Sequence, residues 1–471
     1  MSIVLSVSAV NSNFKTEWWT PRLGGPMAAA TLIRLALLAV PLTRTGTNGI
    51  ISADTSSYLI PGRNLLLHGC FFADGVPDLV RTPGYPLFFA ITSQWGMAGT
   101  AVAGAIVSVL SVLLVWKLAR TAFMDDRIAL VAAWIFAFEP LSVLNSIYLL
   151  SDTLYVALFL LSLERLAEFL HRRRLRVLVV AGLWLAAATF VRPVSYYLPV
   201  AWALGLFLVL VRKKGLRWKA PAVLLIGVLP WLAAWQVRNW VETGYSGFAS
   251  ITEVNLYFFT AAEVIANVEH RSFHDTSTEL GYVPFVDQSG QSYLSAFYIS
   301  RHPEQAGWSQ GPRLAYMHTE AVRVIRAHIM VYLRAGVISA VKMVFNPGAG
   351  FFDHLLIPQS SLVSSGLIDA SPVSREILLL KTHFWVAAEK AFFQVILLTL
   401  YFLAARNVFY GGKLNSCRWL LLGVALYFVV VTGVGGGVGA DARLRLPVMP
   451  IVCMFAAAGV IGKKRNGVAI E

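Results

Sequence analysis

Long apolar windows constrain the fold of this chain more than any other feature. Several windows are apolar over roughly 18 or more residues, enough for a helix to cross a ~30 Å hydrocarbon core. They are too long and too continuous to be barrel strands. Only 14% of the 471 residues are charged, so the sequence predicts an all-α, polytopic membrane bundle. The candidate spans are 27–43, 100–120, 127–147, 149–170, 177–191, 195–211, 219–237, 384–404, 417–434 and 446–462.

Positive charge clusters between these windows and predicts the orientation of the bundle. The formal net charge is +14, but basic residues gather near helix ends, which is typical of cytoplasmic loops rather than of a nucleic-acid surface. Anionic lipid headgroups are therefore the expected partners. With both termini in the cytoplasm, about ten spans result if 83–95 is re-entrant or broken. The basic clusters are 117–127, 171–176, 212–219, 406–418 and 463–465.

Polarity along the chain divides it into three predicted parts. Residues 1–238 form an N-terminal transmembrane module whose first external loop, 44–82, contains short helices. Residues 239–383 form a more polar extracytoplasmic region. Residues 384–471 hold the C-terminal transmembrane helices. Within the middle part, 313–345 has helical spacing and is either a lid for an acceptor or an ordinary surface helix on the outer leaflet.

Two aspartates at the outer ends of apolar segments are the candidate catalytic acids. Asp54 follows the first span and Asp152 begins a later one. Either could simply cap a helix, since Asp favours that position. The predicted topology, however, places both on one side of the membrane, where two carboxylates could share general-base work and positioning. Tyr58 lies one helical turn beyond Asp54 and shares its face.

Arginines at the same predicted level are candidate phosphate ligands. Arg192, Arg238 (next to Asn239), Arg443 and Arg445 all end or begin spans on the outer side, against the positive-inside bias. A guanidinium binds phosphate bidentately and keeps its charge. The alternative is that each side chain extends to the lipid headgroups. Arg34, inside the first span, is expected to face the bundle interior.

The order of these residues resembles a known family. The chain has an acid and a tyrosine after the first helix, then Asn64 to Gly69, then Arg81-Thr82-Pro83-Gly84-Tyr85-Pro86. Leu149 to Leu154, Val191-Arg192-Pro193, Arg238-Asn239 and Arg443 to Pro447 follow. This order resembles bacterial GT-C glycosyltransferases related to protein O-mannosyltransferases and lipid A aminoarabinose transferases.

The resemblance implies a fold, a donor and roles for individual residues. It implies transfer of a sugar from a polyprenyl-phosphate donor to a hydroxyl or similar acceptor on the periplasmic or extracellular face of a bacterial inner membrane. Asp54 would be the general base and Asp152 a second catalytic acid. Thr55 stands where protein O-mannosyltransferases place a second acid, which argues against that exact activity. The resemblance implies that Arg192, Arg238 and Arg443 bind the donor phosphate or shape the site. The full set of predicted donor and substrate ligands is Tyr58, Arg63, Arg81, Tyr85, Arg192, Arg238, Asn239, Arg443 and Arg445.

Two other functions fit parts of the same pattern. A transporter or flippase of lipid-linked sugars would be expected to show inverted repeats and interrupted helices at mid-depth, which the sequence lacks. An O-antigen-ligase-like transferase could use His302 or His318, but it would leave the early acidic loop without a role. The histidines show no metal-ligand spacing, so no metal ligand is predicted and dependence on a divalent ion is left open. The sugar and the acceptor do not follow from the sequence.

Overall fold

The structure, a computed structural model, describes residues 21–52, 54–282, 291–348, 384–436 and 441–462. Within these ranges the regular structure is almost wholly helical, which confirms the predicted all-α fold. The exception is one short antiparallel hairpin in the first loop, β1 (Phe72–Ala73) and β2 (Val76–Pro77). In that hairpin Phe72 pairs with Pro77 and Ala73 with Val76.

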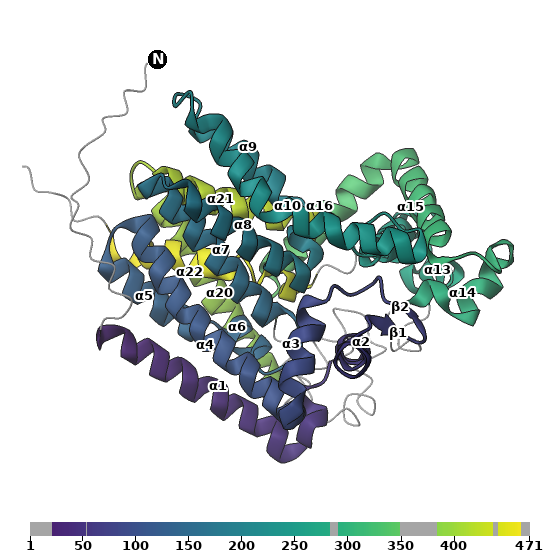
Figure 1. Cartoon of the computed structure of the whole chain (residues 1–471). Coiled ribbons are helices and arrows are strands. Elements are labelled where there is room, and N and C mark those ends of the chain that lie inside the picture. The colour runs from purple at the N-terminus through teal and green to yellow at the C-terminus, as the bar shows by residue number, and fades with distance from the viewer. Residues whose placement is uncertain (1–20, 53, 283–290, 349–383, 437–440, 463–471) are drawn as a thin grey trace, which may run out of the picture.

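The helices form a main bundle from which a smaller helical region projects (Figure 1). The N-terminal helices are α1 (Gly24–Arg44), α2 (Thr55–His68), α3 (Gly84–Thr92), α4 (Gly96–Phe123), α5 (Asp126–Ala137), α6 (Pro140–Asn145), α7 (Asp152–Arg172), α8 (Leu175–Val191), α9 (Leu198–Val209) and α10 (Leu216–Thr243). The projecting region contains α11 (Ile251–Val254), α12 (Ala262–Glu269), α13 (Phe273–Glu279), α14 (Ala296–Arg301), α15 (Gln310–Ala327) and α16 (Ile329–Phe345). The last helices are α20 (Phe384–Tyr410), α21 (Ser416–Phe428) and α22 (Met449–Ile461).

Five helical stretches in the described residues are long and apolar enough to cross a membrane. A sixth would be added if the bent pair of α15 and α16 formed one span. This result fits an integral membrane protein, but the predicted number of about ten spans is not confirmed. The five stretches are Gly24–Arg44, Gly84–Phe123, Leu216–Thr243, Phe384–Tyr410 and Ser416–Val434.

The window 127–147 was predicted as one span and is instead two short helices. α5 ends at Ala137, and α6 begins at Pro140. Proline has no N–H to donate and disfavours helical backbone at the residue before it, so Glu139 is extended. The buried Glu139 carboxylate then accepts hydrogen bonds from the backbone N–H groups of Leu141 and Ser142. The apolar pattern alone does not reveal this break.

Two other segments are also interrupted. The predicted break in 83–95 is present, because α3 is followed by a 3-10 turn, Ser93–Trp95, and α4 begins at Gly96 with a left-handed φ of 76°. The helical stretch predicted at 313–345 consists of α15 and α16, which meet at 98°. Its predicted role as a lid or a surface helix stays a prediction.

The core of the main bundle is built around α7 and α22. α7 packs between α4 and α8, and α22 packs against α5 and α20. Close approach depends on small residues, as is typical of membrane helices. A Cβ atom on Gly182 of α8 would lie 2.7 Å from the Leu224 carbonyl oxygen of α10. A larger residue there would therefore push α8 and α10 apart.

The first loop contributes to a second, separate hydrophobic core. Leu79 and Val80, which follow the hairpin, are buried with Tyr245, Phe258 and Tyr293 of the projecting region. This region is thus fixed to the first loop by side-chain packing. The predicted boundaries at 238 and 383 stay predictions, and residues 349–383 lie outside the described residues.

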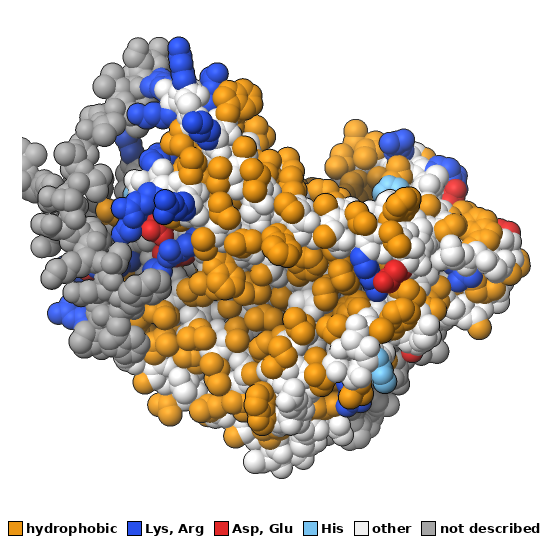
Figure 2. Space-filling view, viewed as in Figure 1, with side chains coloured by type: hydrophobic (Ala, Val, Ile, Leu, Met, Phe, Trp, Pro, Cys, Tyr) orange, Lys and Arg blue, Asp and Glu red, His pale blue; other side chains and the backbone are white. Residues whose placement is uncertain are grey.

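Surface charge follows the pattern expected for a membrane protein. Figure 2 shows an apolar band across the middle of the visible face. Lys and Arg side chains gather at the upper left, near the ends of α7 and α9 in Figure 1. The first loop lies at the opposite end of the bundle. The predicted orientation, which places the first loop outside the cell, stays a prediction.

The native cysteines allow a direct test of this orientation. Cys70 lies in the first loop and is exposed, whereas Cys417 and Cys453 are buried. We expect a membrane-impermeant maleimide, added to intact cells or spheroplasts, to label the protein at Cys70 alone. The Cys70→Ser variant is the control and should lose the label. Labelling of Cys70 only after the membrane is permeabilised would contradict the predicted orientation.

Candidate active site

Asp54 lies immediately before α2 but does not act as a helix cap. Its side chain makes no hydrogen bond to the first turn of the helix. The neighbouring Thr55 hydroxyl accepts a hydrogen bond from the Ser52 N–H (2.9 Å) and donates one to the Leu149 carbonyl oxygen (3.1 Å). Thr55 therefore organises this end of α2 and ties it to the segment before α7. The Asp54 carboxylate is left available for other partners.

Those partners are two arginines from distant parts of the chain. Arg81 Nη2 donates to Asp54 Oδ1 at 3.0 Å, and Arg443 Nη2 donates to Asp54 Oδ2 at 2.8 Å. Arg81 follows the hairpin, and Arg443 lies in the 3-10 turn Ala442–Arg445 that precedes α22. About a third of the Asp54 side chain remains accessible, at 34%. The carboxylate is thus ion-paired on both oxygens and still reachable from outside.

Tyr58 holds Arg81 in this position. The Arg81 guanidinium lies 4.3 Å from the centroid of the Tyr58 ring and donates to its hydroxyl at 3.1 Å. Arg81 Nε also donates to Ser57 Oγ at 2.8 Å. The Tyr85 ring packs edge-to-face on Tyr58, with centroids 4.9 Å apart. The Tyr58 hydroxyl is also within hydrogen-bond distance of Ser151 Oγ, at 3.1 Å.

Asp152 completes the cluster from the first turn of α7. It is buried and forms an ion pair with Arg192, which lies at the end of α8. Its Oδ2 lies 4.0 Å from Nε of Arg443. Arg443 therefore stands between the two carboxylates. The structure brings together Asp54, Asp152, Tyr58, Arg81, Tyr85, Arg192 and Arg443.

The ion pairs of the cluster hold Asp54 and Arg443 in their charged forms. Burial disfavours the charged Asp54 carboxylate, but the guanidinium groups of Arg81 and Arg443 outweigh it and hold the Asp54 pKa well below its usual range. Burial also opposes the charge on Arg443, yet Asp54 raises the Arg443 pKa overall. Burial lowers the pKa of Arg192 to about 10, with the neighbouring Arg443 acting in the same direction. All these groups are ionised near neutral pH.

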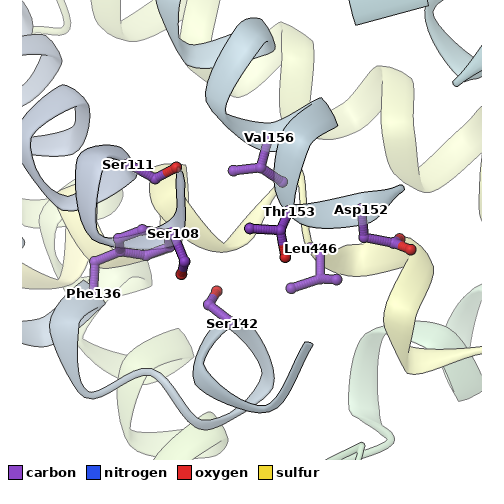
Figure 3. Close-up of a pocket in the computed structure, with 8 residues that line it drawn as sticks. All are labelled: Ser108, Ser111, Phe136, Ser142, Asp152, Thr153, Val156 and Leu446. Carbon is purple, nitrogen blue, oxygen red and sulfur yellow. The ribbon is translucent and has the colours of Figure 1, made fainter. Parts of the chain in front are cut away.

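A small pocket lies behind Asp152, inside the bundle. Figure 3 shows the hydroxyls of Ser108 and Ser142 pointing toward one another across it, while the Asp152 carboxyl points away toward the C-terminal ribbon. Ser108 Oγ also accepts a hydrogen bond from Nε of Arg34, at 2.7 Å. Arg34 is fully buried, which confirms that it faces the bundle interior. The remaining pocket residues are Ser111, Phe136, Thr153, Val156 and Leu446.

Arg238 and Asn239 do not join the cluster. Arg238 donates to the carbonyl oxygens of Asp78 (3.2 Å) and Phe71 (3.0 Å) and forms an ion pair with Glu242. Asn239 donates to the carbonyl oxygens of Gly247 and Phe248. Both side chains thus fix the first loop and the start of the projecting region to the C-terminal end of α10. These contacts do not support their predicted role in donor binding.

Arg445 and Arg63 are also placed away from the cluster. Arg445 is buried, and its Nη1 lies 2.7–2.8 Å from the carbonyl oxygens of Met343, Val344 and Asn346 at the end of α16. It therefore satisfies backbone groups that α16 leaves without partners at its C-terminus. Arg63 is exposed on α2. The predicted donor contacts of both residues stay predictions without support from this geometry.

Ser57 and Ser151 were not among the predicted site residues, although both contact the site. Ser57 accepts a hydrogen bond from Arg81, and Ser151 pairs with Tyr58. Their positions carried a signal, because Ser57 lies one turn beyond Asp54 and Ser151 directly precedes Asp152. Within the described residues, no group of three or more His, Cys, Asp or Glu side chains is arranged to hold a metal ion.

Comparison with known proteins gives one match to a family. The model of the dolichyl-phosphate-mannose-protein mannosyltransferase family (PMT_2) matches residues 85–236. The predicted GT-C resemblance is confirmed over this segment, which includes Asp152 and Arg192. No curated protein matches the sequence.

Solved structures show partial likeness. The archaeal oligosaccharyltransferase AglB from Archaeoglobus fulgidus, in complex with an inhibitory peptide and a dolichol-phosphate, is 16% identical, with a TM-score of 0.47. That match covers 96% of this chain but 51% of AglB, so the chain spans about half the length of that protein. ArnT from Cupriavidus metallidurans, bound to undecaprenyl phosphate, is 11% identical, with a TM-score of 0.37 and coverage of 92% and 77%.

Replacement of Arg445 should weaken the fold rather than the site. In Arg445→Leu, the carbonyl oxygens at the end of α16 would stay buried without donors, and we expect a loss of about 3 kcal/mol in stability. The measurement is denaturant unfolding in detergent, with the exposed Lys413→Met as the matched control. A variant of unchanged stability that no longer binds undecaprenyl phosphate would contradict this assignment and restore the predicted phosphate role.

Proposed function

We propose that this protein is a GT-C membrane glycosyltransferase that moves a sugar from a polyprenyl-phosphate donor to an acceptor hydroxyl. The family match over residues 85–236 supports the enzyme class. The apolar helices supply walls for a polyprenyl chain, and the charged cluster forms at the start of α2, at the first turn of α7 and in the turn before α22. The proposed site of transfer is the outer face of a bacterial inner membrane, with both termini in the cytoplasm and anionic lipids at the basic end.

The observation that carries the proposal is the charge of the cluster. Three guanidinium groups, from Arg81, Arg192 and Arg443, face two carboxylates, from Asp54 and Asp152. The formal charge of these five side chains is therefore +1. The exposed Asp441, which is not counted here, also raises the pKa of Arg443. A sugar phosphodiester carries one negative charge. A partly buried site with that excess is suited to a phosphodiester, and more so to the phosphate released from it.

The proposed reaction breaks one bond and forms another at the anomeric carbon of the sugar. The acceptor oxygen bonds to this carbon while the bond from the carbon to the phosphate oxygen breaks. The acceptor proton passes to the Asp54 carboxylate. The electron pair of the broken bond stays on the polyprenyl phosphate, where Arg443 and its neighbours stabilise the negative charge.

Asp54 as the structure shows it is a weak base, because two guanidinium groups stabilise its charged form. The donor phosphate changes this balance, since it competes with Asp54 for Arg443 and Arg81. As these arginines turn toward the phosphate, the pKa of Asp54 rises and the carboxylate becomes a better proton acceptor. Donor binding and activation of the base are then one event. Asp152 is buried and paired with Arg192, and its proposed role is to hold Arg443 between the Asp54 carboxylate and its own.

The alternative functions find less support in this geometry. A flippase of lipid-linked sugars needs polar groups along its transport path, whereas the ion-paired cluster is built from residues at helix ends. A ligase-like reaction through His302 is also unsupported. His302 packs among Tyr257, Tyr298 and Tyr316, and within the described residues no contact joins it to Asp54.

The Asp54→Asn variant tests the proposal in a reconstituted assay with labelled polyprenyl-phosphate sugar. The amide cannot accept the acceptor proton, so we expect transfer to fall by about 100-fold or more. Binding of undecaprenyl phosphate should be retained or tightened, because one anion that competes for Arg443 is gone. Asp275→Asn, at an exposed position of α13, is the control. Full transfer by Asp54→Asn would exclude Asp54 as the base, and movement of intact lipid-linked sugar without transfer would favour the flippase.

A further inference from the structure

Asp78 is a buried acid that the proposed reaction does not use. It lies between the hairpin and Arg81, and its side chain is 0% exposed. Its Oδ2 atom has no hydrogen-bond partner among the described residues. A buried carboxylate costs free energy unless it is paired or hydrogen-bonded. The other oxygen of Asp78, Oδ1, makes the hydrogen bonds that offset this cost.

The Asp78 carboxylate controls the backbone at Arg81. Its Oδ1 accepts hydrogen bonds from the N–H groups of Val80 (2.8 Å) and Arg81 (3.1 Å). Such side-chain-to-backbone bonds fix the path of a tight turn. The path of the turn sets the position of the Arg81 Cα atom, from which the Arg81 side chain extends to Asp54. Asp78 is thus linked to the donor site through a single residue.

Other elements hold this turn from its outer side. Arg238 of α10 donates to the Asp78 carbonyl oxygen, and Gln310 of α15 donates to that of Pro77 (3.2 Å). The Ser250 N–H donates to the Leu79 carbonyl oxygen at 2.7 Å. These contacts fix residues 77–79 to α10 and to the projecting region. Within the described residues, the Arg81 N–H donates to the Asp78 side chain alone.

We propose that Asp78 is a positioning residue for Arg81 and that its ionisation state tunes how well the site binds the donor phosphate. This inference rests on the proposed function, because it assumes that Arg81 contacts the phosphate of a polyprenyl donor. The ionised carboxylate is the stronger acceptor and holds the turn more firmly than the protonated one. Donor affinity should therefore be greatest when Asp78 is charged.

The surroundings of Asp78 place this titration near neutral pH. Burial raises its pKa to about 7, although the bonds from the Arg81 and Val80 N–H groups and the charges of Arg81 and Arg238 oppose the shift. Function and stability then respond to pH in opposite directions. Because the folded pKa lies above that of the unfolded chain, the stabilisation is present at low pH and is lost as pH rises through 7. The charged and titratable groups packed around the turn are Arg81, Arg238, Glu242, Tyr245 and Tyr293.

The test compares two substitutions with a matched control. Asp78→Asn keeps an oxygen that can accept both N–H bonds but cannot ionise, whereas Asp78→Ala removes the acceptor. Asp74→Asn changes the exposed turn of the same hairpin, where the φ of 53° suits asparagine. Binding of undecaprenyl phosphate to the full-length protein in detergent is measured at pH 6 and pH 8. At pH 8 we expect about tenfold weaker binding for Asp78→Ala and near-normal binding for Asp78→Asn and Asp74→Asn.

The pH series separates positioning from a general loss of structure. The phosphate probe titrates itself, but equally for every variant, so the difference between variants reports Asp78. From pH 8 to pH 6 the wild type should lose more affinity than Asp78→Asn, while its melting temperature rises and that of Asp78→Asn stays level. Equal pH slopes for the two proteins would overturn the inference, even if Asp78→Ala failed to fold. So would normal binding by a folded Asp78→Ala. If the wild type itself binds no undecaprenyl phosphate, the proposed function fails instead.

Discussion

The ion pairs of Asp54 with Arg81 and Arg443 join segments that are far apart in the sequence. Asp54 and Arg443 are separated by 389 positions, yet their side chains lie 2.8 Å apart. Near the membrane boundary an unpaired charge is costly, so each of these groups requires the others. The start of α2, the exit of the hairpin and the turn before α22 are therefore held in one arrangement. The ion pairs of Asp54 therefore both form the site and join the N-terminal and C-terminal segments of the bundle.

This dependence explains why a second set of arginines surrounds the site without entering it. Arg238 holds the hairpin, and Arg445 holds the end of α16, both through backbone carbonyl oxygens. The paired guanidinium groups can move toward a phosphate only if the surrounding backbone stays in place. A rigid frame around a few exchangeable ion pairs meets both needs. Arg238 and Arg445 thus support the frame, whereas binding of charge is proposed for Arg81, Arg192 and Arg443.

Much of the fold follows from the sequence because a membrane imposes length and apolarity on each helix. The helical bundle, the interior position of Arg34 and the interruption near Gly96 were predictable on these grounds. The break at Pro140 was missed, because the window was judged on its apolar content, whereas the pair Glu139-Pro140 already carried the signal for a helix end. The roles of Arg238 and Arg445 were also hidden, because their partners are backbone carbonyl oxygens that no residue pattern displays. The predicted topology was enough to place Asp54 and Asp152 on the same side of the membrane. The contacts of Ser57, Ser151 and Asp78 could be recognised only in the three-dimensional arrangement.

A structure solved with undecaprenyl phosphate bound would locate the donor site. We expect the phosphate to lie within hydrogen-bond reach, ~3 Å, of the Arg443 guanidinium. We also expect Arg443 or Arg81 to have turned away from Asp54 toward the phosphate. A phosphate bound elsewhere, with both arginines still paired to Asp54, would contradict the claim that this cluster is the donor site.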